Sequence, residues 1–290
     1  MAIKGYLIYN ITKENDEIFT SQIAAWINAF KLENVDIKVV NNLLALDTIK
    51  SDKDVRFVLF WDKDVALMYE LANLGIKLFN NIDAVRLADD KAYTYARLIK
   101  YKVNTPRTLV MPLTFIVDLT KYFDAIKSLL KVHGINYPMV VKERRNSLGL
   151  GVYLVKSDEE LRCVLKEKWS RELIVQEYIG YEPGVDYRVY VINHRPKVVV
   201  MRKNTKDFRS NIEQGGVMSV IVNPHKDLLK IALKASLAVQ LDFGAIDIVR
   251  DANNKYYVLE VNSNARTATI DKIAKTPLTR SVVKYILNNI

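Results

Sequence analysis

The sequence predicts an α/β fold in which a small domain with a parallel sheet precedes a larger α+β region. In the first part of the chain, short apolar strands alternate with amphipathic stretches, as in parallel sheets covered by helices. In the second part, helices give way to a strand-rich region that ends with two strands spaced for a hairpin. The length of 290 residues suits about two domains of ordinary size.

Residues 1–84 predict the parallel α/β domain. Amphipathic stretches at 18–30 and 65–74 are typical of helices, and Gly75 is a natural helix stop. The residues after the first strand, Tyr-Asn-Ile-Thr, hold no glycine fingerprint, so a Rossmann-type dinucleotide site is not indicated. The strands of this domain are expected at 5–9, 35–40 and 56–61.

The rest of the chain predicts two further regions, 85–175 and 176–290. In the first of them, one long helix is expected over 84–101, with further helices at 119–132 and 158–168 and strands at 139–142 and 151–155. In the second, helices are expected at 228–241 and 278–287, and the strands at 173–178, 186–192, 197–202, 244–250 and 256–261.

Charge divides the chain unevenly. The whole sequence has 43 Lys and Arg against 33 Asp and Glu, a net charge of +10, and the excess lies entirely after residue 84. This asymmetry indicates an anionic partner there, such as nucleotide phosphates, an acidic peptide or nucleic acid. The single cysteine, Cys163, excludes an internal disulfide and a Cys-rich zinc site. The N-terminal sequence is not built like a signal peptide, so we expect a cytoplasmic protein that does not enter a membrane.

The predicted hairpin at the end of the strand-rich region carries a candidate metal site. If Asn253 and Asn254 form a two-residue turn, Asp247 lies opposite Glu260, and Asn262 shares their face. Leu259 then lies on the other face. Opposed like charges repel, so replacing both acids should stabilise the metal-free protein, whereas Mg²⁺ between them removes the penalty. A solvated polar face is the alternative.

A turn-rich loop follows the apolar strand that ends at Lys142. Residues 146–151 are Asn-Ser-Leu-Gly-Leu-Gly, and backbone N–H groups in such a loop can bind phosphate oxygens beside a lysine. A plain hairpin connection would have the same pattern. The Gly-Lys-Ser/Thr ending of a Walker A loop is absent.

Further polar residues follow along the next strands. Glu177 and Tyr178 end an apolar strand, which suits an adenine pocket or a linker. Asp186, Arg188 and Tyr190 alternate along one strand face. A basic run then indicates either a solvated face or an anion site; it consists of Arg195, Lys197, Arg202, Lys203, Lys206 and Arg209.

Taken together, these residues resemble the ATP-grasp superfamily and, within it, the RimK-type α-L-glutamate ligases. The resemblance covers about residues 78–290, and its most specific part is Asp-Phe-Arg-Ser-Asn at 207–211 followed by Gly215 and Gly216. It implies an ATP-grasp fold with a preceding small parallel α/β domain. The other matching blocks are Leu-Ala-Asp-Asp-Lys at 87–91, Pro-Met-Val-Val-Lys at 138–142, Val-Gln-Glu-Tyr-Ile at 175–179, Asp-Ile at 247–248 and Glu-Val-Asn at 260–262.

The resemblance also implies roles for individual residues. Around ATP it places Lys91 and Lys142 at the phosphates, Glu177 and Tyr178 at adenine, and Asp186 at the ribose, with Arg188 and Lys203 in the same nucleotide site. At the phosphate end or acyl-phosphate site it places Arg209, Ser210 and Asn211, of which Arg209 and Asn211 are the expected catalytic residues. It assigns Mg²⁺ (or Mn²⁺) to Asp247, Glu260 and Asn262.

The implied reaction is carboxylate–amine ligation. A carboxylate attacks the γ-phosphate of ATP, and an amine then displaces phosphate from the acyl phosphate. The carboxylate belongs to an acidic peptide or a small molecule, and the amine to an amino acid, either glutamate or another. Arg266 stands where relatives usually have a proline–glycine turn, so we expect it to recognise an acidic substrate. We also expect a homo-oligomer.

Two alternatives of other classes remain open at this stage. A nucleotide-binding regulator would keep the pocket and lose turnover, although the presence of all the expected metal ligands argues against it. A nucleic-acid-binding module would use the basic part of the chain, but the aromatic residues expected between the basic ones for single strands are missing.

Overall fold

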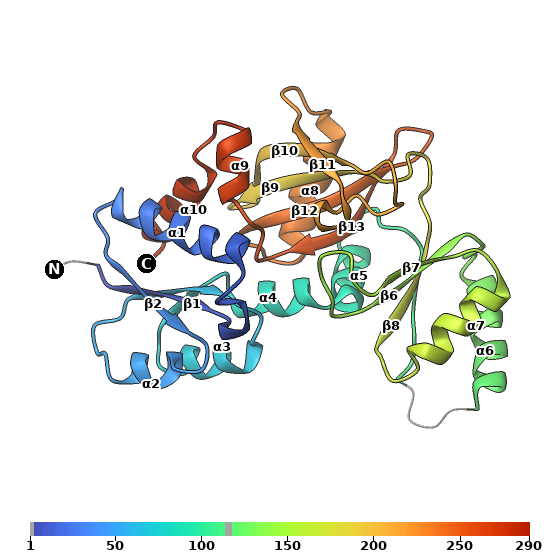
Figure 1. Cartoon of the computed structure of the whole chain (residues 1–290), viewed down its shortest axis with the longest axis horizontal. Helices are drawn as coiled ribbons and strands as arrows, with labels where there is room; N and C mark the ends of the chain where they lie inside the picture. Colours follow the sequence, from blue (N-terminus) through green and yellow to red (C-terminus); the bar gives the residue numbers. More distant parts are fainter. Residues whose placement is uncertain (1–2, 114–117) are drawn as a thin grey trace.

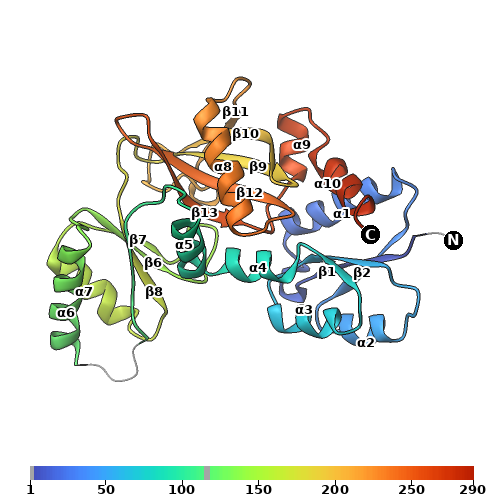
Figure 2. The ribbon, with the colours of Figure 1, turned by 180° about the vertical axis from the view of Figure 1, so that it is seen from behind.

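The computed structural model describes residues 3–113 and 118–290, and these residues form three sheets (Figures 1 and 2). No helix in the described ranges is long and apolar enough to cross a bilayer. The chain is an α/β protein, as the sequence predicts, with one parallel sheet and two antiparallel ones.

The N-terminal sheet is parallel, in the order β2-β1-β3-β4. Helix α1 packs on one face of this sheet and α2 and α3 pack on the other, which is why all five residues of β3 are buried. The elements are β1 (Gly5–Tyr9), η1 (Ile11–Lys13), α1 (Glu17–Lys31), β2 (Ile37–Asn41), α2 (Ala45–Lys50), β3 (Phe57–Trp61), α3 (Val65–Ala72) and β4 (Lys77–Phe79).

The second sheet is antiparallel, in the order β5-β8-β6-β7. Its side chains alternate: Val141 and Val175 pack under the helices, whereas Lys142 and Gln176 lie on the opposite face. The elements are β5 (Thr108–Val110), α6 (Leu119–Val132), β6 (Met139–Glu143), β7 (Val152–Val155), α7 (Asp158–Glu167) and β8 (Leu173–Glu177).

The third sheet has five strands in the order β11-β10-β9-β12-β13. Helices α4 (Ile82–Asp89), α5 (Lys91–Lys100) and α8 bury one of its faces. The other face is apolar at one end, where Ile192 and Phe243 join the core described below, and polar at the other end. The elements are β9 (Val185–Ile192), β10 (Arg195–Lys203), η2 (Ile212–Gln214), β11 (Val217–Val220), α8 (Lys226–Ala238), β12 (Phe243–Arg250), β13 (Tyr256–Asn262), α9 (Ala268–Ile273) and α10 (Leu278–Leu287).

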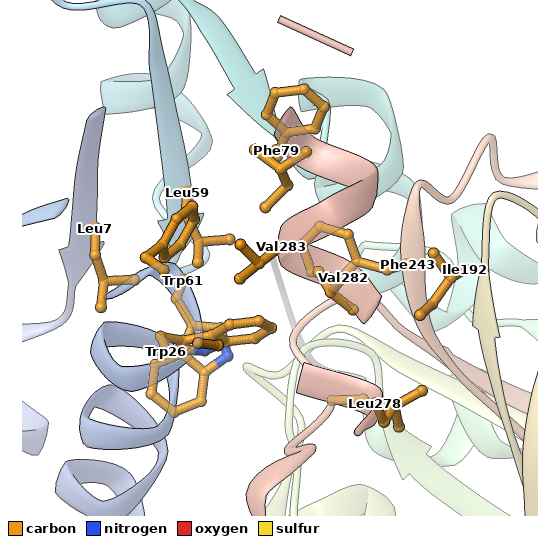
Figure 3. Packing of buried hydrophobic residues seen from close by; sticks show 14 of the residues in the cluster. Leu7, Trp26, Leu59, Trp61, Phe79, Ile192, Phe243, Leu278, Val282 and Val283 are labelled. Atoms are coloured by element: carbon orange, nitrogen blue, oxygen red, sulfur yellow. The ribbon is translucent and has the colours of Figure 1, made fainter. Parts of the chain in front are cut away.

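A shared core joins the first and third sheets. In Figure 3, Val282 and Val283 of α10 lie between Trp61 of the N-terminal sheet and Phe243 of β12. The buried Asn80 adds a polar link, because its side chain donates to the carbonyls of Phe243 and Ser263 and accepts from two N–H groups of the 242–243 backbone. The C-terminal helices are therefore part of the contact between these two sheets.

The predicted helix over 84–101 is wrong in one respect: the structure has two helices, α4 (Ile82–Asp89) and α5 (Lys91–Lys100). Asp90 breaks them apart because its backbone is extended and its carboxylate caps α5, accepting from the Ala92 and Tyr93 N–H groups. The same carboxylate forms an ion pair with Arg144, at 2.6 and 3.0 Å. The break makes Lys91 the first residue of α5.

The other predicted helices and strands are present within a few residues of their expected ends. The pattern missed short elements, namely β4, β5, β11, α2 and α9, because three to six residues carry too little periodicity. The expected boundaries after residues 84 and 175 fall inside α4 and β8, so each would divide a helix or a strand.

Candidate functional site

The β12–β13 hairpin pairs Asp247 with Glu260 and Ala245 with Asn262, which confirms the predicted register at the site. The predicted two-residue turn is wrong. The Asp251 N–H donates to the Lys255 carbonyl, so the loop has three residues, with Asn254 at a φ of 60°. A β-bulge after Asp247 absorbs the extra residue and restores the register.

The bulge also changes one side chain's direction. The alternation predicts Leu259 on the face opposite Asp247 and Glu260, but this residue lines the same cavity as they do. Val258 packs under α8 in its place, because the bulge moves the alternation by one residue.

A first cavity, of about 880 Å³, lies between the second and third sheets. Most of the residues that the sequence singled out line it, although they come from seven separate segments of the chain. They are Lys91, Lys142, Glu177, Tyr178, Asp186, Arg209, Ser210, Asn211, Asp247 and Glu260.

Lys142 lies deep in the first cavity and is 8% exposed. Its Nζ donates to Oε1 of Gln176 on the neighbouring strand at 2.6 Å, and Gln176 in turn donates to Thr108. Burial lowers the pKa of Lys142 to about 8, since the charged ammonium loses its hydration, while the nearby Glu260 acts in the opposite direction. An anion bound here would restore the full charge.

The 146–151 loop closes one side of the first cavity. Lys91 Nζ donates to the Asn146 carbonyl at 2.7 Å, and Arg209 Nη1 donates to the Gly149 carbonyl at 2.9 Å. Gly149 has a φ of +74°, and a Cβ there would lie only 3.0 Å from Oδ1 of Asn211. Glycine is therefore needed for both the turn and the close approach of Asn211.

The other end of the first cavity is apolar and aromatic. Val140, Val152 and Ile179 line it, and Tyr178 meets Phe208 edge to face with ring centroids 6.3 Å apart. The Glu177 carboxylate accepts two hydrogen bonds from the Arg107 guanidinium, at 2.9 and 2.6 Å, and this ion pair lowers its pKa. This end suits a flat, mostly apolar group.

Two arginines hold two buried aspartates at the opposite end of this cavity; Arg202 is buried, and Arg188 is mostly buried, with 17% of its side chain exposed. Arg188 forms a bidentate pair with Asp247, with both distances 2.7 Å. Arg202 forms a bidentate pair with Asp186 and lies 3.0 Å from Asp247. Burial alone would raise the pKa of both carboxyl groups. At Asp247 the two arginines outweigh burial and lower the pKa. At Asp186 burial prevails and the pKa is raised.

Arg202 is a site residue that sequence reasoning did not select. It stands within the basic run, where a solvated face was the alternative, but it is 4% exposed. The strand pairing could have indicated it, because β10 places Arg202 directly opposite Asp186, a predicted site residue on β9. Side chains alternate along β10, so Lys203 turns away and lines neither this cavity nor the next. The structure thus does not bring Lys203 to the site.

A second cavity, of about 1430 Å³, adjoins the first. One wall is the carboxyl edge of the N-terminal sheet, where Asn10 follows β1 and Asp62 follows β3. The facing wall includes Arg188 and the segment from Asn262 to Arg266. The two cavities meet at four residues that line both: Ser147, Arg202, Asn211 and Glu260.

Similarity to known proteins identifies the family. The model of the RimK-like ATP-grasp domain matches residues 88–286. The chain belongs to this family. It is 30% identical over 76% of its length to the uncharacterized protein MG012 homolog of Mycoplasma pneumoniae, with 76% of that protein covered. It is 28% identical over 76% of its length to a ribosomal protein bS6–L-glutamate ligase of Escherichia coli O7:K1, with 71% covered.

Among solved structures, this ATP-grasp chain is similar to D-alanine–D-alanine ligase from Bacillus anthracis complexed with ATP. The TM-score is 0.77 at 18% identity, covering 99% of this chain and 97% of that one. This similarity extends through the N-terminal domain, where the family model does not reach. The predicted ATP-grasp fold with a preceding small α/β domain is confirmed.

The oxygens at the end of the hairpin fit the Mg²⁺ or Mn²⁺ that ATP-grasp enzymes use. Glu260 lines both cavities and forms an ion pair with Lys91 Nζ at 3.8 Å, longer than a hydrogen bond. Within the described ranges no group of three or more His, Cys, Asp and Glu is arranged for a metal. Asp247, Glu260 and Asn262 would leave several coordination positions of Mg²⁺ to phosphate oxygens and water, which is usual for this ion.

Proposed function

We propose that the chain is an ATP- and Mg²⁺-dependent carboxylate–amine ligase that forms a peptide-like bond through an acyl phosphate. One observation carries the proposal: a cavity suited to a nucleotide opens into a second, larger cavity at Arg202, Asn211 and Glu260. A phosphoryl group held in the first cavity would thus meet a carboxylate held in the second.

We propose that ATP binds the first cavity in one direction. Adenine would lie at the apolar end near Tyr178, and the phosphates would lie near Lys142, Lys91 and the 146–151 loop. Asp186 is assigned to the ribose by resemblance, and its carboxylate is already held by Arg202. A ribose hydroxyl would therefore have to bind the oxygens of this ion pair.

The metal belongs at the junction of the two cavities. Asp247, Glu260 and Asn262 would hold it, and it would supply positive charge against the phosphate oxygens. Arg188 keeps Asp247 ionised and fixes the direction of its carboxylate by two hydrogen bonds.

The chemistry requires positioning and charge more than a protein nucleophile. A substrate carboxylate oxygen attacks the γ-phosphorus, the bond to the β-phosphate oxygen breaks, and ADP leaves. An amine then attacks the acyl carbon, loses a proton, and phosphate leaves. Arg209 and Asn211 line the first cavity beside the loop; in this proposal Arg209 offsets negative charge on the transferred group and Asn211 donates a hydrogen bond to it.

The substrates are proposed only by class. An amino acid is the proposed amine, and glutamate is supported by the name of the E. coli relative. The carboxylate substrate is proposed to be an acidic peptide or a small molecule. Arg266 lines the second cavity, in agreement with its expected place near an acidic group.

The decisive experiment measures ADP formation. The full chain is incubated with ATP, Mg²⁺ and pairwise combinations of amino acids with acidic peptides or small carboxylates, and the products are identified by mass spectrometry. We expect ADP formation to require both substrates and the product to have the summed mass less one water. Tight ATP binding without substrate-dependent ADP release would instead favour the nucleotide-binding regulator.

A further inference from the structure

The second cavity contains a carboxylate that the described parts of the chain leave uncompensated. Asp62 lines the cavity and is 7% exposed. Its Oδ1 accepts hydrogen bonds from the Asn10 side chain at 3.0 Å and from the Lys63 N–H at 2.8 Å. Its Oδ2 is buried and has no partner, and none of the ion pairs among the described residues includes Asp62. A buried charge in this state is costly unless a cation joins it.

The neighbouring lysines do not supply that cation. Lys63, the next residue, forms its ion pair with Asp89 at 2.7 Å. Lys13, on the same wall of the cavity, forms one with Asp16 at 3.7 Å. The bonds from Asn10 and the Lys63 backbone are neutral, so they orient the Asp62 carboxylate without cancelling its charge.

A second acceptor without a partner lies beside Asp62. Asn264 donates through Nδ2 to the Asp62 carbonyl at 2.7 Å, which fixes the direction of its amide. Its Oδ1 is buried and unpartnered, like Oδ2 of Asp62. Among the described residues, these two oxygens are the only buried side-chain acceptors without a partner, and both belong to residues that line this cavity.

We propose that Asp62 and Asn264 recognise a primary ammonium group of a substrate bound in the second cavity, whose entry must open access to the two oxygens, since both are closed to solvent in the ligand-free chain. The inference rests on the proposed function and names the recognition chemistry of its second site. An ammonium carries one positive charge and three N–H donors, which matches one uncompensated carboxylate and an amide oxygen. A divalent metal is a poor match, because it needs more oxygen ligands than these two residues offer.

Two sources supply this ammonium, namely the amino acid that acts as the amine and an α-amino group on the substrate whose carboxylate is activated. The shared chemistry predicts that a ligand with the amino group binds more tightly than the same ligand without it. A ligand without the amino group leaves the buried Asp62 carboxylate unpaired, and this cost is the main reason for the expected difference in affinity.

The test compares amines with their desamino twins. Calorimetry on the full chain, with Mg²⁺ and a non-hydrolysable ATP analogue, measures the affinities of L-glutamate against glutarate and of L-alanine against propionate. In the wild type we expect the amine to bind at least about tenfold more tightly in one pair, about 1.4 kcal/mol. Asp62→Asn should reduce that ratio to about threefold or less, and Asn264→Ala should reduce it by a smaller factor.

The matched control is the double variant Lys63→Met/Asp89→Asn, which removes an acid that lines the same cavity together with its lysine and so leaves no free ammonium beside Asp62. It should keep the wild-type ratio. Thermal unfolding shows whether each variant is folded; the amide introduced by Asp62→Asn keeps an oxygen for the bonds from Asn10 and the Lys63 N–H. Equal binding of both members of each pair, no binding of any of the four, or an unchanged ratio in Asp62→Asn would overturn the proposal.

The same variants separate this inference from the proposed ligase. If ADP formation depends on two substrates and Asp62→Asn leaves both Michaelis constants unchanged, the ammonium site is wrong and the ligase stands. If no ADP forms but the amine preference disappears in Asp62→Asn, the ammonium site stands and the ligase is wrong. When both hold, the substrate whose Michaelis constant rises in Asp62→Asn identifies the source of the ammonium.

Discussion

Arg188 and Asp247 face each other across β9 and β12, and two hydrogen bonds of 2.7 Å join the guanidinium to the carboxylate. This pair changes the electrostatics expected from the hairpin alone. Seen in the sequence, Asp247 and Glu260 are like charges at opposed positions that repel. In the structure, Asp247 also lies 3.0 Å from Arg202, so two cations surround it.

Asp247→Asn should therefore destabilise the metal-free protein, contrary to the stabilisation that the hairpin pattern predicts for removing these acids. The change leaves Arg188 buried without its counter-ion, and breaking a buried pair in this way costs about 3–5 kcal/mol. Urea denaturation in the presence of a chelator measures the loss. Glu260→Gln is the control: its side chain is 29% exposed and its ion pair is long, so we expect a change below about 1 kcal/mol.

The same two variants test the metal site. Asp247→Asn and Glu260→Gln should each abolish Mg²⁺-dependent ADP formation, because both remove a hard anionic ligand. Measuring turnover against Mg²⁺ concentration separates lost metal binding from lost fold, since Glu260→Gln is expected to stay folded. Wild-type metal dependence in both variants would reject the assignment.

ATP binding should be coupled to proton uptake by Lys142. With a pKa of about 8 in the empty site, this ammonium is about half deprotonated at pH 8. Phosphates beside it favour the charged form, so ATP binding should take up as much as about half a proton at this pH. Calorimetry in two buffers of different ionisation enthalpy measures the uptake. Lys142→Met should abolish it, and uptake that persists in this variant would contradict the assignment of Lys142 to the phosphates.

Lys142 also predicts a trend of stability with pH. Its pKa is lower in the folded protein than the ordinary value of 10.5, so the unfolded chain binds more protons between about pH 8 and 10.5. Lys142 therefore destabilises the folded protein below this pH range, and this destabilisation decreases as the pH rises from about 8 to 10.5. Relative to Lys142→Met, the wild type should gain free energy of unfolding between about pH 7.5 and 10.

Arg202→Lys should impair the reaction more than nucleotide binding. Lysine keeps the charge near Asp186 and Asp247 but loses the planar fork that pairs with Asp186 while also approaching Asp247. Because Arg202 lines both cavities, we expect kcat to fall about 100-fold, with the Michaelis constant for ATP within about threefold of wild type. A raised Michaelis constant for ATP with kcat unchanged would instead show that Arg202 serves only to bind ATP.

Arg266→Ala should raise the Michaelis constant of the carboxylate-bearing substrate about tenfold, equivalent to about 1.4 kcal/mol. Arg266 lines the second cavity but not the first, so the constant for ATP should barely change. Steady-state kinetics with each substrate varied in turn provides the measurement. If both constants or neither changed, a substrate-specific role for Arg266 would be rejected.

The sequence by itself determined the strand and helix pattern, the ATP-grasp resemblance and the pairing of Asp247 with Glu260. The pattern and the pairing depend on local information, namely side-chain alternation, amphipathic periodicity and a hairpin between adjacent strands, whereas the resemblance depends on matching motifs such as 207–211. Even so, the predicted hairpin turn is wrong, and the register at the site holds only because a bulge compensates for the longer loop.

Only the tertiary structure decided which charges meet. Arg202 and Asp186 lie on neighbouring strands, but whether they point into a cavity or into water depends on the sheet that packs over them. Asp62 and Asn264 are 202 residues apart, and their contact requires the N-terminal sheet to dock through α10. Periodicity reports which face of an element is buried, and it carries no information about which distant polar group is buried beside it; that is set by packing across domains.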